Sequence, residues 1–195
     1  MPTIERIRTR DLRYELEGGA GSDAVHTDPQ YGYGVAVLEA DGGLSGHGLA
    51  YTLGGGTDLV CRAIEQLAEP LIGREVEELM AEFGSVQKRM AEHHQLRWLG
   101  PHKGVIHLAL ASITNACFDL WAKARGVPLW RLLLDLSSDA IVDLVDWSYL
   151  EDVMTRDEAR EVLESRRPTR AERSDVLETG YPCLLYTSPS PRDPE

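Results

Sequence analysis

Cysteine is scarce in this sequence, and its scarcity excludes one class of small protein. The 195 residues contain three cysteines, Cys61, Cys117 and Cys183, which are far apart and odd in number. A disulfide framework needs paired cysteines in a short chain, so this pattern favours a reducing compartment. The first residues contain no basic segment followed by an apolar run, and a secretory signal is therefore not expected. Together these features predict a cytoplasmic protein.

Basic residues are also fewer than acidic ones. The chain has 20 Lys and Arg but 32 Asp and Glu, which gives a net charge of -12. Nucleic acids and anionic lipids both require a basic face, so neither is expected as a partner. The most apolar stretch, residues 104–122, is interrupted by His107, Asn115 and Asp119. These polar residues predict a core helix rather than a membrane span.

The first part of the chain predicts a three-stranded antiparallel meander. Residues 3–16 alternate as an edge strand does, and residues 18–32 are rich in glycine and aspartate, which is typical of a loop. Two β-prone runs then flank Asp41, Gly42 and Gly43, and this sequence favours a tight hairpin turn.

Helices are predicted for most of the remainder. Thr57 is expected to cap a helix whose apolar face includes Leu59 and Ile64, and a second helix is expected over 76–92. A long helix follows Pro101 and ends at Gly126, and Pro128 begins a short one. Residues 140–150 predict another strand, and residues 155–180 predict two polar helices broken at Pro168. A meander followed by helices is an α+β pattern.

Several separated motifs resemble one known family. The segment "NACFDLWAKARGVPLWRLL", residues 115–133, resembles the N-terminal capping domain of the enolase superfamily, in its mandelate racemase branch. The segments "GSDAVHTDPQY", residues 21–31, and "QLRWLGPHKGVIHLA", residues 95–109, are similar to those of L-fuconate dehydratases. The resemblance covers residues 1–182. It implies a capping domain over 1–136, and over 137–182 a lead-in to a β/α barrel that is truncated here.

The resemblance also implies a reaction. L-Fuconate would lose its α-proton to a barrel base and its β-hydroxyl as water, giving 2-keto-3-deoxy-L-fuconate, with Mg²⁺ stabilising the enediolate. The metal ligands and acid–base residues of this family belong to the barrel, which takes roughly 250 residues by itself. We therefore expect no catalytic or metal-binding residue in this chain, no activity of the fragment alone, and a homo-oligomeric parent enzyme. The alternatives are another acid-sugar dehydratase or racemase of the superfamily, or a non-catalytic binding module that resembles a capping domain.

Four residues are expected to contact the small sugar-acid substrate. The resemblance implies that Gly21, Ser22, Asp23 and Tyr31 line the substrate pocket from the capping side. Glycine lets backbone N–H groups approach a ligand, and Ser, Asp and Tyr can bind sugar hydroxyls. The family usually has a small residue at the position of Ser22. The alternative is a solvated loop without a ligand.

Other polar residues are expected to have structural roles. His26 and Asp28 form too small a set for a metal, so His26 is predicted to brace the loop. Residues 53–58, "LGGGTD", predict a tight turn with a cap near the mouth of the pocket. Asp119 is expected to anchor a neighbouring backbone or arginine, and Cys61 and Cys117 are expected to be unreactive core thiols.

The last residues differ from the rest of the chain. Residues 183–193, "CLLYTSPSPRD", match one reading frame of a transposase adapter used in sequencing libraries, so residues 183–195 are predicted to be translated adapter and disordered. The alternative is a genuine disordered tail rich in serine and proline.

Overall fold

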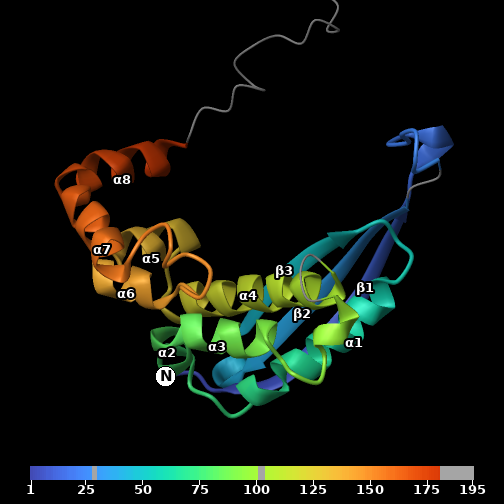
Figure 1. Cartoon of the computed structure of the whole chain (residues 1–195), viewed down its shortest axis with the longest axis horizontal. Coiled ribbons are helices and arrows are strands. Elements are labelled where there is room, and N and C mark those ends of the chain that lie inside the picture. The colour runs from blue at the N-terminus through green and yellow to red at the C-terminus, as the bar shows by residue number, and fades with distance from the viewer. Residues whose placement is uncertain (28–29, 101–103, 181–195) are drawn as a thin grey trace, which may run out of the picture.

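The computed structural model describes residues 1–27, 30–100 and 104–180. It shows an antiparallel sheet in the order β1-β2-β3, covered on one side by helices, and a helical extension, residues 138–179, that leaves the sheet (Figure 1). The predicted α+β class and the three-stranded meander are therefore confirmed. The predicted tail, residues 183–195, lies outside the described residues.

The three strands are β1 (Ile4–Glu15), β2 (Gln30–Ala40) and β3 (Ser45–Thr52). Tyr14 of β1 pairs with Tyr31, and Thr52 of β3 pairs with Gly32. A single turn of 3₁₀ helix, η2 (Asp41–Gly43), joins β2 to β3. Gly42 in this turn has a φ of +69°, which only glycine adopts without strain, and this confirms the predicted turn.

The described residues contain eight α-helices and five short 3₁₀ segments in all, of which η2 joins β2 to β3. A further 3₁₀ turn, η1 (Glu17–Gly19), follows β1. In chain order, the elements after β3 are α1 (Thr57–Ala68), η3 (Glu69–Leu71), α2 (Val76–Ala81), α3 (Phe83–Ala91), η4 (Arg97–Leu99), α4 (Val105–Ala124), α5 (Leu129–Asp135), α6 (Ser138–Asp143), α7 (Arg156–Ser165), η5 (Arg167–Thr169) and α8 (Arg170–Thr179).

The core lies between the sheet and helices α1 to α4. The inward residues of β2 include Ala36 and Leu38, both fully buried. Glycines on β3 let α4 approach the sheet closely, because a Cβ atom on Gly48 would lie 2.0 Å from the carbonyl oxygen of Ser112. Ser112 is itself buried and donates its hydroxyl to the Gly34 carbonyl at 2.8 Å. Close backbone contact and a buried hydrogen bond therefore fix α4 on the sheet.

Helix α4 is the one helix of the described residues that is long and apolar enough to cross a membrane by length and composition. It packs on β3 and α1, and 56% of its most apolar window is buried inside the protein. Ile113 and Leu120 are completely buried there. This packing agrees with the core helix that the sequence predicts.

Some predictions were wrong. Residues 140–150 do not form a strand: Ser137 caps α6 by accepting from the Ala140 N–H at 3.1 Å, and turns follow the helix. The helix predicted over 76–92 is two helices, α2 and α3, which meet at Glu82. Leu59 is 54% exposed and does not belong to the apolar face of α1. The predicted boundary between 136 and 137 stays a prediction, although it falls between α5 and α6.

Candidate functional site

The predicted site residues lie at one end of the sheet. The loop from β1 to β2 and the connection from β3 to α1 both leave the sheet at this end, since Glu15 pairs with Gln30 and Gly32 with Thr52. Figure 1 shows the first loop as a projection beyond β1 and β2. We refer to this end of the sheet, with residues 16–27 and 53–56, as the sheet tip.

Asp23 organises the first loop. Its Oδ1 accepts hydrogen bonds from the backbone N–H of Val25 at 2.8 Å and of His26 at 2.7 Å. The imidazole Nδ1 of His26 lies 3.0 Å from Oδ2 of the same carboxylate. The backbone hydrogen bond from His26 is the largest cause of a lowered pKa, and together these donors lower the pKa of Asp23 to about 2. The predicted bracing role of His26 is therefore confirmed, with Asp23 as its partner.

Gly21 and Ser22 close the same loop. Gly21 has a φ of +72°, a conformation that favours glycine. The hydroxyl of Ser22 donates to the Thr27 carbonyl at 2.8 Å, so the loop is tied across its base. The structure thus brings Gly21, Ser22 and Asp23 together in one hydrogen-bonded loop. Both Ser22 and Asp23 are exposed to solvent.

Tyr31 lies outside this loop, at the second residue of strand β2, within a cluster of aromatic rings. Its ring meets that of Tyr51 edge to face, with centroids 5.3 Å apart. Tyr51 also contacts Tyr33 at 5.8 Å, and Tyr33 contacts Tyr14 at 6.0 Å. Desolvation is the main cause that raises the pKa of Tyr51, and the electrostatic influence of the neighbouring Tyr31 and Tyr33 raises it further. Edge-to-face packing fixes these rings, so the phenol groups are held in place at the tip.

The connection from β3 to α1 is the predicted tight turn. Gly54 and Gly56 have φ values of +91° and +81°. Thr57 donates its hydroxyl to the Gly54 carbonyl at 2.8 Å, and its oxygen lies 2.6 Å from that of Thr52. The predicted cap was wrong in one respect: Gly56 occupies the cap position, and Thr57 is the first residue of α1. Its side chain closes the turn instead of capping the helix.

Sequence reasoning missed Tyr51. It lies in a predicted strand and carries no motif, but the alternation of β3 places it on the same face as Tyr31 and Tyr33. A search for aromatic residues at matching registers of adjacent strands would have found the cluster. The sequence cannot give the register itself, because a shift of one residue moves Tyr51 to the other face.

The described residues do not suit a magnesium ion. Mg²⁺ needs several oxygen ligands in octahedral geometry. No group of three or more His, Cys, Asp and Glu side chains comes together in residues 1–27, 30–100 and 104–180. In the HTD segment, His26 is bonded to Asp23, and Asp28 lies outside the described residues. The described part of the tip therefore offers hydrogen-bonding groups but no cluster of metal ligands, and we assign no metal chemistry to it.

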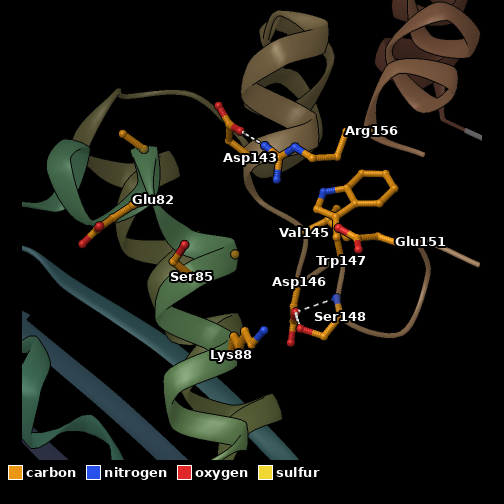
Figure 2. A pocket seen from close by; sticks show the side chains of 12 residues that line it. Glu82, Ser85, Lys88, Asp143, Val145, Asp146, Trp147, Ser148, Glu151 and Arg156 are labelled. Carbon is orange, nitrogen blue, oxygen red and sulfur yellow. Dashed lines mark hydrogen bonds and ion pairs between the residues drawn. The ribbon is translucent and has the colours of Figure 1, made fainter. Parts of the chain in front are cut away.

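A separate cavity of about 450 Å³ lies between α3 and residues 143–156 (Figure 2). Asp143 pairs with Arg156, whose guanidinium lies 5.9 Å from the centre of the Trp147 ring. The Asp146 carboxylate accepts from the Ser148 hydroxyl at 2.7 Å. These groups are paired or hydrogen-bonded with one another. We therefore assign a structural role to the residues that line the cavity, which lies where residues 143–156 pack beside α3.

The other singled-out residues have structural partners. Oδ2 of Asp119 accepts from the His47 backbone N–H at 2.8 Å and from Lys123 at 2.6 Å, which confirms the predicted anchor. Cys61 and Cys117 are both buried. Burial raises the pKa of both thiols, that of Cys117 to about 12, so they stay protonated as predicted for unreactive core cysteines.

Known proteins with this sequence pattern share one domain type. The family described as "Mandelate racemase / muconate lactonizing enzyme, N-terminal domain" matches residues 22–133. Mitochondrial enolase superfamily member 1 of Bos taurus is 42% identical over 189 residues, covering 95% of this chain and 42% of that protein. L-Galactonate dehydratase of Hypocrea jecorina is 39% identical over 187 residues, again covering 95% and 42%.

The crystal structure of human mitochondrial enolase superfamily member 1 has the same fold, with a TM-score of 0.84 and 38% identity. It covers 89% of this chain, which in turn covers 40% of that structure. A magnesium-bound racemase from Streptomyces coelicolor is more distant, with a TM-score of 0.56 and 25% identity. This chain therefore spans about two fifths of the length of the curated relatives that it matches.

Proposed function

We propose, from the premise that this chain belongs to the mandelate racemase / muconate lactonizing enzyme family by its N-terminal domain, that it is the capping domain of an acid-sugar dehydratase that acts on L-fuconate. The observation that carries the proposal is the loop of residues 21–27 at the sheet tip. Its sequence resembles that of L-fuconate dehydratases, and the hydrogen bonds of Ser22 and Asp23 hold the loop in one shape. The proposed product is 2-keto-3-deoxy-L-fuconate.

Each residue of the tip would have a distinct role toward the sugar acid. The Ser22 hydroxyl donates to Thr27, so it offers its lone pairs to a substrate hydroxyl. The Asp23 carboxylate already accepts hydrogen bonds from the backbone of its own loop. We therefore propose that its main role is to position Gly21 and Ser22. Tyr31 would supply a phenol that Tyr51 holds in place. Mg²⁺ would stabilise the enediolate in the complete enzyme, and the described residues of this chain take no part in that step.

The test is binding of L-fuconate to the 195-residue chain, followed by NMR of backbone amides. We expect shifts confined to residues 21–27 and 31, and a severalfold weaker effect for Tyr31→Phe, since a lost hydrogen bond costs about 1 kcal/mol. Thr169→Ala, on the distant η5 segment, is the matched control and should bind as the parent does. Shifts distributed over the whole chain, or none at the tip, would refute the assignment of the tip.

L-Galactonate is the second candidate substrate, because one relative with 39% identity is an L-galactonate dehydratase. The two sugar acids share their stereochemistry and differ in one hydroxyl at C6. Parallel titrations with both therefore separate them: tighter binding of L-galactonate would show that the tip recognises the additional hydroxyl. The chain alone should not dehydrate either acid in the presence of Mg²⁺. Turnover that survives further purification would contradict this.

A further inference from the structure

Two threonine hydroxyl groups lie beneath strand β2 at the sheet tip. Thr57 is completely buried, and its oxygen lies 2.6 Å from that of Thr52. Thr57 donates to the Gly54 carbonyl at 2.8 Å, and the Gly54 N–H donates to the Thr52 oxygen at 3.4 Å. A hydroxyl group carries one proton, so Thr57, which donates to Gly54, accepts the proton of Thr52. The direction of each hydrogen bond in the set is therefore fixed.

These hydrogen bonds form a closed cycle. The Gly54 N–H donates to Thr52, Thr52 donates to Thr57, and Thr57 donates to the carbonyl of Gly54, where the cycle began. Hydrogen bonds connected in this way polarise and strengthen one another. Loss of one hydroxyl leaves a buried partner unsatisfied, which costs more than the bond itself contributes. We refer to Thr52, Gly54 and Thr57 as the hydroxyl cycle.

The hydroxyl cycle lies directly against the two residues that flank Tyr31. A Cβ atom on Gly32 would lie 2.3 Å and 2.8 Å from the two hydroxyl oxygens of the cycle, so glycine leaves the room that they occupy. On the other side of Tyr31, a Cβ atom on Gly54 would lie 2.7 Å from the Cβ atom of Gln30. The backbone before and after Tyr31 therefore packs on the hydroxyl cycle.

The side chain of Tyr31 is held on the opposite face of the sheet. Successive residues of a strand alternate between faces, so Gly32 faces the hydroxyl cycle and Tyr31 points away from it. There the side chain of Tyr31 meets that of Tyr51 edge to face, with centroids 5.3 Å apart. Two contacts thus fix this tyrosine: the cycle holds its backbone, and Tyr51 holds its phenol.

We propose that Thr52 and Thr57 are positioning residues, which set the place of the Tyr31 phenol through the hydroxyl cycle. The start of β2 cannot shift toward the helices while the cycle is closed, because both hydroxyls fill the space beneath Gly32. The turn after β3 therefore controls a side chain that belongs to a different strand. This inference rests on the proposed function only where it concerns the sugar acid, since the contact between the cycle and β2 does not depend on a ligand.

The first test needs no ligand. Thr57→Val replaces the hydroxyl by a methyl group and leaves the Thr52 hydroxyl without its acceptor. In NMR spectra of the 195-residue chain we expect faster exchange of the Gly54 amide, shifted aromatic signals of Tyr31 and a weaker nuclear Overhauser effect between Tyr31 and Tyr51. Thr57→Ser keeps the hydroxyl and should restore the parent spectrum. Unchanged Tyr31 signals in Thr57→Val overturn the proposal.

Two further variants control this test. Thr114 of α4 has a buried hydroxyl oxygen with no hydrogen-bond partner among the described residues, so Thr114→Val is the matched control and should leave Tyr31 unchanged. Thr52→Ala opens the same cycle at its partly exposed member and should shift Tyr31 as Thr57→Val does, which keeps the test decisive if Thr57→Val does not fold. Circular dichroism checks the fold of each variant. Equal shifts from Thr114→Val overturn the proposal.

Titration with L-fuconate separates this proposal from the proposed function. We expect Thr57→Val to bind severalfold more weakly than the parent chain, and Thr57→Ser to bind as the parent does. The double variant with Tyr31→Phe should bind no more weakly than Tyr31→Phe alone, because both changes act through one phenol. If only Tyr31→Phe weakens binding, the positioning role is wrong and the proposed function stands. If the parent does not bind, the proposed function is wrong, and the signals of Tyr31 decide on the positioning role.

Discussion

The two parts of the chain differ in what stabilises them. Residues 4–132 share one large apolar core that contains side chains from the sheet and from α1 to α5. Residues 138–163 share a cluster of only three buried residues, Val142, Trp147 and Ala159. The second part relies instead on caps and exposed ion pairs, such as Arg160 with Asp139 and Asp157. Exposed pairs contribute about 0–1 kcal/mol each, so the extension is expected to unfold locally before the core does.

The strongest test of this comparison is removal of a central core side chain. Phe83 is 1% exposed and its ring meets Phe118 at 5.4 Å. Phe83→Ala should lower the free energy of unfolding by about 3–5 kcal/mol, because it leaves a cavity that the core cannot refill. Urea unfolding followed by circular dichroism measures the change. Val153→Ala, at an exposed site of the extension, should leave the midpoint unchanged; an equal loss in both would contradict the comparison.

A smaller effect is expected from adding one methyl group between sheet and helix. Gly48→Ala places a Cβ 2.0 Å from the Ser112 carbonyl oxygen, so α4 must move. We expect a loss of about 1–3 kcal/mol. Gly55→Ala is the matched control, because a Cβ there meets nothing within 4 Å. If both variants unfold at the same urea concentration, the close approach of α4 is not what fixes the core.

Removal of the capping box of α7 should destabilise the extension without affecting the core. The side chain of Thr155 accepts from the Glu158 backbone N–H, and the Glu158 carboxylate accepts in return from the Thr155 N–H at 2.7 Å. Thr155→Ala should destabilise α7 by about 1 kcal/mol. Hydrogen exchange should rise in α7 while exchange in α4 stays unchanged. Thr155→Ser keeps the cap and should behave as the parent does; faster exchange in α4 would show that the two parts unfold together.

The smallest effect concerns the loop at the sheet tip and its dependence on pH. The pKa of Asp23 is lowered from 3.8 to about 2 by the hydrogen bonds that its carboxylate accepts. The contribution of this carboxylate to loop order is therefore complete above about pH 4 and is lost as the pH falls through about 2. An NMR titration of the side-chain carboxyl carbon should give a midpoint well below 3.8. A midpoint at the ordinary value would show that the loop is open in solution.

Much of the fold could be predicted from local sequence. Alternation over residues 3–16 and the Asp41-Gly42-Gly43 turn predict the meander because strand geometry and positive φ are local properties. Gly126, with a φ of +67°, and Pro128 correctly place the break between α4 and α5 for the same reason. The candidate loop was found by its motif. The hydrogen bonds that connect Asp23 to His26 were not predicted as a pair, since they depend on how the loop closes.

Tertiary structure decided the features for which local patterns are ambiguous. Residues 140–150 are apolar enough for a strand, but they become α6 and turns, because Ser137 caps the helix and Trp147 donates to the Val142 carbonyl at 2.8 Å. A short apolar run fits a helix or a strand equally well until its packing partners are known. The register of the sheet, and with it the tyrosine cluster, likewise depends on contacts between strands that are distant in the sequence. By itself the sequence determined the turn at Asp41-Gly42-Gly43 and the end of α4 at Gly126, because these depend on local backbone geometry, and only long-range packing decided which apolar residues are buried together.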